Sequence, residues 1–399
     1  MLESIRQLGP VSRAQVARAT GLSKPTVSQA LASLESSGLV REAGRSSGGK
    51  GPTAVLYEVN ASAGFVVGLD VGRSHVRAAL ADLSGQIVGQ RDERARARTA
   101  SSLIEQIGTL ARRVATDANV PWVHVAYACV GSPGVLQPGH DSIRLAPNLP
   151  GWEREGVLDA VRHTMGRPVA FENDVNLATL GEQRRGLGKG VANFVYLHIG
   201  TGVGMGLVLN GDLYHGNSGA AGEVGYLPIA ARDPHDRSTR RRGALESAVS
   251  AAAVVEEARR LRVRGATDAK AVFDAARDGS VAARRATAVI AERIALAIAT
   301  VAPIADPELV ILGGGIGRQG DVLLEPVEQE VALLSPFRPR IEVSALGEDA
   351  ELQGAIALGL QFAQALLFDR TRARPSPLAS RSHRNVRTGD RPPAKEGLG

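Results

Sequence analysis

The sequence predicts an α/β protein in which a small N-terminal winged helix-turn-helix is followed by a body of two lobes. Two short amphipathic helical patterns joined by a glycine occur before residue 40, and a glycine-rich hairpin pattern follows them. Two similar strand–glycine loop–strand patterns, beginning near Gly64 and Asn193, indicate two related lobes. The length of 399 residues allows this arrangement, because a domain takes roughly 100–200 residues.

Composition excludes several other classes of protein. Hydrophobic residues make up 44% of the chain and charged residues 22%, which excludes a wholly disordered chain, a collagen and a coiled-coil rod. The single cysteine, Cys129, excludes an intrachain disulfide and a multi-cysteine metal site and suits a reducing cytoplasm. No run approaches the ~20 consecutive apolar residues of a membrane helix, and residues 1–7 lack a signal-peptide core. We therefore expect a cytoplasmic protein with no membrane partner.

Positive charge is concentrated at the two ends of the chain. Residues 1–60 carry seven Lys or Arg against four acidic residues, residues 369–399 carry eight against three, and residues 61–368 carry 32 against 34. Nucleic-acid binding therefore belongs to an end of the chain and not to the body. We predict a DNA-binding domain at 1–60, a two-lobed body at 61–368 with the lobe boundary near residue 185, and a disordered basic tail at 369–399.

The first helix of the predicted helix-turn-helix begins after Ser12, whose hydroxyl is suited to capping it. Val16 and Ala17 occupy its inward positions. Gly21 then supplies a sharp turn, because glycine adopts a left-handed backbone at the least cost. Leu22 is expected to return into the core.

The second helix is predicted to begin after Ser23, with Pro25 in its first turn, where a missing N–H costs nothing. An apolar stripe at i, i+4 and i+7 faces the core and consists of Val27, Leu31 and Leu34. The opposite face presents short polar and basic side chains at the end that enters the major groove in this motif. The predicted DNA-binding residues of this helix are Ser23, Lys24, Thr26, Ser28 and Gln29.

A glycine-rich hairpin with strands over 39–42 and 55–59 is typical of a wing. Arg45 and Lys50 are predicted in its loop, within reach of phosphates or the minor groove. A plain helical hairpin is the alternative, but the turn, the caps, the stripe and the basic wing all agree on the winged domain. Residues 1–8 leave room for only a short supporting helix, so either the start codon lies upstream or this helix is trimmed.

The body contains three glycine loops that each close a predicted strand. These loops are Asp70-Val71-Gly72, Gly200-Thr201-Gly202-Val203-Gly204 and Gly313-Gly314-Gly315. One such loop is a weak signal, but three of them across a two-lobed chain indicate close approach of backbone to a phosphate or a flat ligand.

On these motifs the chain resembles the ROK family of repressors and sugar kinases, over essentially residues 1–368. The resemblance implies two ribonuclease-H-like lobes, as in actin and sugar kinases, with a cleft between them. It also implies nucleotide contacts at the glycine loops. The corresponding residues are Asp70, Gly72, Gly200, Thr201, Gly202, Gly204, Gly313 and Gly314.

Further motifs resemble the sugar side of the family's cleft. They are the run 146–152 (APNLPGW), the run 172–176 (ENDVN) and the run 219–226 (GAAGEVGY). By resemblance the sugar-binding residues are Asn148, Asn173, Asp174, Glu223, Tyr226 and Glu246, and Asp174 is the base if kinase activity survives. Carboxylates and amides bridge adjacent hydroxyls, and a Trp such as Trp152 can lie over the apolar face of a pyranose. Alone, Asp174 would be interpreted as a loop or helix-cap carboxylate.

Two departures from the family pattern bear on function. Arg73 and Ser74 follow Gly72 where the kinase-type loop has Gly-Thr, and the Arg side chain crowds the approach to phosphate, although its charge could attract one. This change argues against ATP binding and more strongly against kinase turnover. The family's zinc ligands are also replaced, so zinc is expected to be absent. The replaced positions are Tyr226, Arg237, Thr239 and Ala244.

We therefore predict a sugar-responsive transcriptional regulator that binds operator DNA as a homodimer or homotetramer and needs no cofactor. Repression relieved by the sugar is the default expectation, and activation is the alternative. The rival function is an ATP-dependent sugar kinase with an appended DNA-binding head. A third possibility is a DNA-binding scaffold whose pocket is vestigial.

Overall fold

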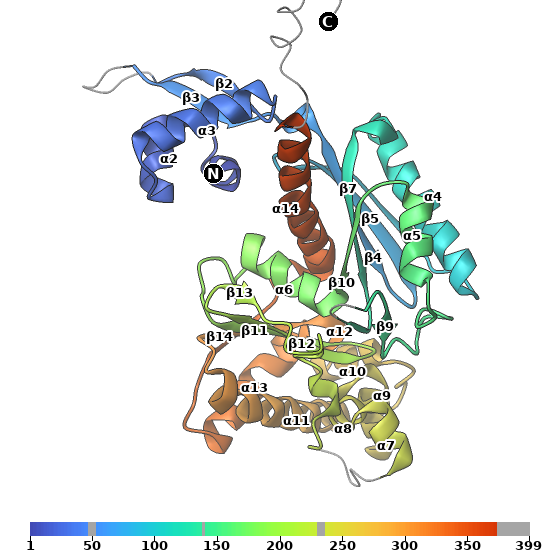
Figure 1. The fold of residues 1–399 in the computed structure, drawn as a ribbon. Coiled ribbons are helices and arrows are strands. Elements are labelled where there is room, and N and C mark those ends of the chain that lie inside the picture. Colours follow the sequence, from blue (N-terminus) through green and yellow to red (C-terminus); the bar gives the residue numbers. More distant parts are fainter. Residues whose placement is uncertain (47–52, 138–139, 230–235, 373–399) are drawn as a thin grey trace, which may run out of the picture.

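The computed structural model describes residues 1–46, 53–137, 140–229 and 236–372. Figure 1 shows an N-terminal head (residues 1–60) beside a body of two lobes, with one long C-terminal helix between head and body. The predicted wing residue Lys50 and most of the predicted basic tail lie outside the described residues.

The head contains three helices and a three-stranded sheet of order β1-β3-β2. Its elements are α1 (Leu2–Leu8), β1 (Val11–Ser12), α2 (Arg13–Thr20), α3 (Lys24–Ser36), β2 (Val40–Arg45) and β3 (Val55–Val59). Ser12 caps α2 in a capping box with Gln15, and Gly21 ends this helix with a φ of 68°. Both features confirm the predicted turn.

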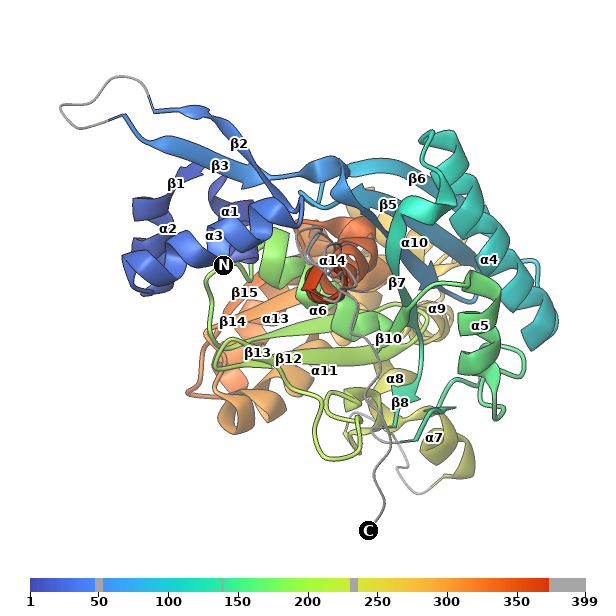
Figure 2. The same cartoon turned by 45° about the horizontal axis from the view of Figure 1, so that its top comes forward.

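Two predictions for the head are wrong. Leu22 is 42% exposed, because the residue after the left-handed Gly21 points away from the core instead of into it. Arg45 is the last residue of β2 and pairs with Val55, so it belongs to a strand and not to the loop of the wing. The register of β2 against β3 shifts at a bulge between Glu42 and Gly44, and pairing continues beyond it as far as Arg45. Figure 2 shows this hairpin projecting from the head.

Lobe 1 is built on a five-stranded sheet of order β10-β7-β4-β5-β6, in which three antiparallel strands are continued by two parallel ones. Along β4, Val67, Leu69 and Val71 pack with α4, whereas Val66 packs on the opposite face, as expected of a strand buried on both sides. The elements of lobe 1 are β4 (Phe65–Val71), β5 (His75–Asp82), β6 (Ile87–Arg94), α4 (Ala100–Asp117), β7 (Val125–Ser132), β8 (Val135–Leu136), β9 (Ile143–Arg144), α5 (Val157–Met165) and β10 (Val169–Asn173). Short 3₁₀ turns occur at Ala61–Ala63 and Trp122–His124.

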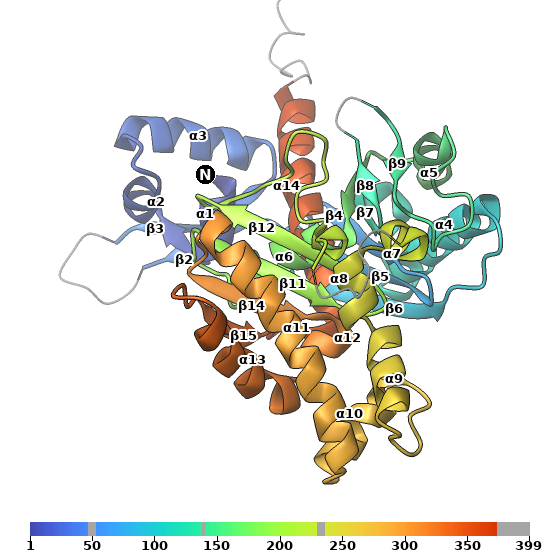
Figure 3. The same cartoon turned by 90° about the horizontal axis from the view of Figure 1, so that it is seen from below.

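Lobe 2 is built on a sheet of order β13-β12-β11-β14-β15. Counted from the other edge, the sheet of lobe 1 has the order β6-β5-β4-β7-β10, so the first three strands of each lobe and the two that follow them take the same places. Its helices cover the face away from lobe 1 (Figure 3). Its elements are β11 (Phe194–Ile199), β12 (Val203–Leu209), β13 (Asp212–Leu213), α7 (Arg237–Arg242), α8 (Ala244–Val249), α9 (Ala251–Arg260), α10 (Ala269–Arg277), α11 (Val281–Ala305), β14 (Leu309–Gly313), α12 (Gly314–Gly317), α13 (Gly320–Leu334) and β15 (Arg340–Val343). Two 3₁₀ turns complete it, η3 (Val224–Tyr226) and η4 (Gly347–Asp349).

Two helices form the layer between the lobes. Helix α14 (Ala350–Arg372) packs on β4 and β7 of lobe 1, and α6 (Asp174–Arg185) packs on β11 and β12 of lobe 2. The two helices also pack on each other. Helix α14 extends four residues beyond the predicted body boundary at 368. The cleft between the lobes therefore opens at the N-terminal ends of both helices.

Helix α11 is the one helix in the described ranges that is long and apolar enough, by composition, to cross a membrane. One of its faces, including Ile290, Ile294 and Ile298, is buried in the core of lobe 2 against α13 and α10. This packing is that of the core helix of a globular lobe.

Candidate functional site

The polar face of α3 forms the candidate DNA interface. Lys24 and Gln29 are exposed, and Ser28 is half-buried. Ser23 caps the helix by accepting the Thr26 N–H at 3.3 Å, and the two hydroxyls lie 2.8 Å apart. Ser23 and Thr26 are therefore occupied in capping, so Lys24 and Gln29 are the side chains best placed to reach DNA.

The first candidate ligand site lies at the N-terminus of α6. Asp174 is the first residue of α6, and its carboxylate accepts the Val175 N–H at 2.9 Å, where the helix dipole favours negative charge. Burial raises the pKa of Asp174, and the Val175 N–H opposes this shift. Asp174 lines a cleft between the lobes of about 770 Å³, which is large enough for a small ligand.

Three further predicted residues gather near Asp174. Glu223 precedes η3, Tyr226 ends it, and Glu246 lies in the first turn of α8. Burial raises the pKa of Glu223 to about 7, and the carboxylates of Asp174 and Glu246 add to the shift. Tyr226 is 41% exposed, and burial of the rest of its side chain raises its pKa. We call Asp174, Glu223, Tyr226 and Glu246 the acidic cluster.

The acidic cluster suits a ligand rich in hydroxyl groups. Glu246 accepts the Val203 N–H at 3.1 Å with one oxygen, and Arg242 lies 3.6 Å from the other. Glu223 and Tyr226 make no side-chain hydrogen bond within the described residues, so their polar atoms remain available. Several acceptors that converge without partners of their own can bind adjacent hydroxyls.

The other residues predicted on the sugar side are placed as follows. Asn173 is the N-cap of α6: its oxygen accepts the Asn176 N–H at 3.1 Å and its amide donates to Gly134 O at 3.0 Å. Half of the hydrogen-bonding capacity of its side chain is thus used by the fold. Asn148 is exposed and forms no hydrogen bond with the acidic cluster. Trp152 is 1% exposed in the core of lobe 1, so the expectation that it stacks on a sugar is wrong.

Sequence reasoning missed one residue on this side. Glu153 follows Trp152, accepts the Ala146 N–H at 2.6 Å, and contributes to the raised pKa of Tyr226. Its loop therefore approaches the acidic cluster. The signal was a charged residue directly after the 146–152 run.

The second part of the cleft contains the three glycine loops. Gly72 N–H donates to His75 O at 2.9 Å, and Gly200 N–H donates to Gly202 O at 2.9 Å, which closes both turns on themselves. A Cβ at Gly313 would lie 2.0 Å from the Tyr196 hydroxyl, so packing within the lobe already requires glycine there. The remaining predicted positions are placed as follows: Thr201 and Gly314 line the cleft, Gly204 packs against Val175 and Gly202 lies beside Glu246.

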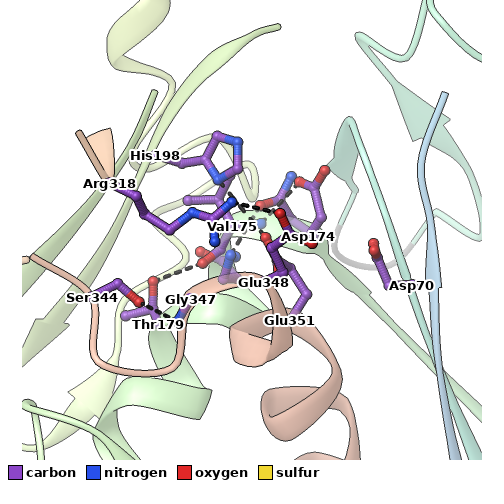
Figure 4. Close-up of polar contacts among 12 residues, drawn as sticks. Asp70, Asp174, Val175, Thr179, His198, Arg318, Ser344, Gly347, Glu348 and Glu351 are labelled. Carbon is purple, nitrogen blue, oxygen red and sulfur yellow. Dashed lines mark hydrogen bonds and ion pairs between the residues drawn. The ribbon is translucent and has the colours of Figure 1, made fainter. Parts of the chain in front are cut away.

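Three residues that sequence reasoning missed line the cleft between these loops. Arg77 donates to Asp70 at 2.6 and 2.9 Å and lies 3.6 Å from Glu351. His198 lies 3.8 Å from Glu351 on the other side. Figure 4 shows Asp174, His198 and Glu351 facing the same space, with Asp70 on a facing strand. We call Asp70, Arg77, His198 and Glu351 the loop-side cluster.

Burial changes the protonation of the loop-side cluster. It lowers the pKa of His198 to about 4 and raises the pKa of Glu351 to about 8, with the Asp70 carboxylate adding to the second shift. At pH 7 both groups are therefore mainly neutral, and their 3.8 Å contact is not an ion pair. Burial also raises the pKa of Asp70, and Arg77 opposes this shift. Among the described arginines that line the cleft, Arg77 and Arg318 have carboxylate partners. Arg77 pairs with Asp70, and Arg318 lies 2.7 Å from Glu348.

The region expected from the family to hold zinc has another structure. Residues 237–242 form helix α7, and no group of three or more His, Cys, Asp or Glu in the described ranges is arranged to hold a metal ion.

Comparison with known proteins agrees with this architecture. The model of the ROK family matches residues 66–361, and a MarR family model matches residues 1–50. A putative xylose repressor from Caldicellulosiruptor sp. (strain Rt8B.4) is 28% identical over 377 residues, covering 90% of this chain and 94% of the relative. A glucokinase from Thermotoga maritima is 34% identical over 249 residues, covering 58% of this chain and 78% of the relative.

Among solved structures, a ROK family transcriptional regulator described as a homolog of the E. coli MLC protein superposes with a TM-score of 0.77. The match has 21% sequence identity and covers 92% of this chain and 96% of that one, so it supports the fold from the head to the end of the body. The chain belongs to the ROK family and carries a helix-turn-helix domain in front of the family body.

Proposed function

We propose that this protein is a sugar-responsive repressor that binds operator DNA through its head and binds a sugar between its lobes. The observation that carries the proposal is the acidic cluster, in which Glu223 lies close to Asp174 and Glu246, and Tyr226 lies close to Glu223. Within the described residues the side chains of Glu223 and Tyr226 have no hydrogen-bond partner, and the body that holds them supports a DNA-binding head. The xylose repressor and the regulator structure among the relatives support the same function. The shared strand order of the two lobes fits the ribonuclease-H-like lobes that the family resemblance implies.

On DNA, Lys24 and Gln29 of α3 read the major groove, and Arg45 at the end of β2 contacts the backbone, with Lys50 predicted beside it. A homodimer or homotetramer in the cytoplasm places two α3 helices one duplex turn, or a multiple of it, apart. Sugar binding must then favour an arrangement of the heads that no longer fits the operator. No membrane or metal takes part.

A second function, phosphorylation of a sugar by ATP, is favoured by the position of Asp174 beside the glycine loops and by the glucokinase relative. The loop-side cluster opposes it. Glu351 lies beside Asp70, where the family resemblance expects phosphate groups, and Arg77 is already paired with Asp70. A triphosphate would therefore meet carboxyl groups, and Arg73, which lines the cleft and has no ion pair among the described residues, is the cation left to attract it.

The test is a band-shift titration with DNA from the promoter upstream of the protein's own gene, against a panel of pentoses and hexoses. Release of the DNA by one sugar is the expected result. Robust ATP-dependent phosphorylation that Asp174→Asn abolishes, without specific DNA binding, would favour the kinase. DNA binding that no saccharide alters would favour a scaffold with a vestigial pocket.

A further inference from the structure

The head rests on lobe 1 through a shared apolar core. Leu2 and Ile5 of α1 belong to the same buried cluster as Val66 and Leu83 of lobe 1 and Leu360 of α14. Ile5 is completely buried in this cluster. Burial of this continuous apolar surface fixes the base of the head to lobe 1 and α14.

Helix α6, in contrast, is fixed to lobe 2. A Cβ at Gly206 of β12 would lie 1.9 Å from the Thr179 hydroxyl, so α6 lies on β12 with no room for a side chain between them. The fully buried Glu182 accepts hydrogen bonds from Ser344 Oγ at 2.6 Å and from Leu187 N at 2.9 Å. Ser344 directly follows β15 of lobe 2, and with the contact to β12 it ties α6 to that lobe, so α6 is expected to move with lobe 2.

The two ends of α6 contact the two functional parts of the molecule. Its first residue, Asp174, belongs to the acidic cluster. At its last turn, Arg184 lies 3.9 Å from Glu3 of α1, and Arg185 donates to Gly85 O in the turn between β5 and β6. Arg6 of α1 donates to the same turn, to Ser84 O at 3.5 Å. The helix has 12 residues and is therefore about 18 Å long.

We propose that α6 is a lever that carries lobe closure from the acidic cluster to the head, an inference that rests on the proposed function. The head is anchored to lobe 1 and α6 to lobe 2, so a rotation of the lobes must change the position of Arg184 and Arg185 relative to α1. The motion is a shear between α6 and α14. A Cβ at Gly354 of α14 would lie 1.8 Å from Leu177 O, so the helices meet backbone to backbone at this point, while the Leu177 side chain packs with Ala355 of α14 and Cys129 of β7.

The test measures amide hydrogen exchange on the full chain, with D-xylose and with D-glucose. In the wild type, the sugar that binds should slow exchange at the N-terminus of α6 and change exchange in α1 by about 5-fold or more, the lower end of common allosteric couplings. In the double variant Arg184→Ala, Arg185→Ala, the response of α6 should remain and that of α1 should fall below about 2-fold. Arg259→Ala, an exposed arginine at the end of α9, is the matched control.

Glu3→Gln removes the Arg184–Glu3 contact from the head, together with the Glu3–Arg6 ion pair within α1, and leaves α6 intact, so it replaces the double variant if that protein does not fold. A response of α1 that persists in the arginine and Glu3 variants overturns the lever, as does a wild type that shows protection of α6 with no change in α1. If neither sugar protects the N-terminus of α6, the proposed function fails for both sugars and the lever fails with it.

Discussion

The acidic cluster and the loop-side cluster both consist mainly of carboxyl groups, but the two clusters differ in how far these groups are paired within the protein. On the sugar side, Glu223 and Tyr226 keep polar atoms without partners in the described chain, close to Asp174. On the loop side, Asp70 is paired with Arg77, and Glu351 and His198 are buried in mainly neutral forms. Polar groups thus remain available for a ligand on the sugar side, whereas on the loop side they are paired with one another or buried in neutral forms.

The largest expected effect concerns Asp174. Asp174→Asn should weaken binding of the effector sugar by about 100-fold, or about 2.7 kcal/mol, because a hydrogen bond to a charged group contributes about 1.5–3 kcal/mol. Isothermal titration with D-xylose and D-glucose measures it. Asp92→Asn, which changes another carboxylate lining the cleft, is the control. An equal loss of sugar affinity in Asp174→Asn and Asp92→Asn would show that the sugar does not bind specifically at the acidic cluster.

The second prediction compares ligands for the two sides. A sugar present at 100 times its Kd should stabilise the protein by about 2.7 kcal/mol. ATP with Mg²⁺ should give little or no stabilisation, because Arg77 and Arg318 are already paired with Asp70 and Glu348 and are not free to bind phosphate. Thermal unfolding measures both ligands. Stabilisation by ATP as large as that by the sugar would show that the loop side is still a nucleotide site.

The third prediction concerns pH. The pKa of Glu223 is about 7 in the folded protein and 4.5 as a reference, so the folded state binds the proton more tightly. Its favourable contribution is complete below about pH 4.5 and is lost as the pH rises to about 7. Glu223→Gln should therefore raise the free energy of unfolding at pH 8 by about 2 kcal/mol relative to the wild type, after allowance for partial exposure.

Urea denaturation at pH 4.5 and pH 8 measures this effect, with the exposed Glu256→Gln as the control. Glu351→Gln extends the comparison to the loop side, where the pKa of about 8 moves the window to higher pH. Identical pH windows for the Glu223 and Glu351 variants would contradict the difference between the two sides.

The smallest expected effect tests whether DNA binding by the head is independent of ligand binding in the cleft. Lys24→Ala should weaken promoter binding and reduce the slope of log affinity against log salt by about 1, with sugar affinity unchanged. Fluorescence anisotropy at several salt concentrations measures it, and the exposed Lys189→Ala is the control. A slope equal to that of the wild type would exclude a phosphate contact of Lys24.

The head could be predicted from sequence in most of its details because its signals are local. Ser12, Gly21 and Ser23 act within a few residues of their own positions, and the caps follow from that chemistry. Leu22 was predicted wrongly because the direction of one side chain after a left-handed turn depends on tertiary packing.

The loop-side cluster could not be predicted in the same way. Arg77 and Glu351 are separated by more than 270 residues of sequence, and the contact exists only because α14 returns to the first sheet. Considered locally, His198 is one polar residue in an apolar strand, and Glu351 is an acid in the first turn of a helix. Asp174 could be predicted as a candidate because its motif is contiguous in the sequence.

The core shared by head and body has a practical consequence for protein engineering. Because Ile5 and Leu2 are covered by lobe 1 and α14, the N-terminal 60 residues are not an interchangeable module that can be cut at the boundary and fused to another sensor. A functional chimera would have to carry the outer surface of the first sheet and the distal half of α14 along with the reading head. We therefore expect that changes in the DNA-binding head and changes in the ligand-binding body arise together in evolution, with compensating substitutions in the apolar core that they share.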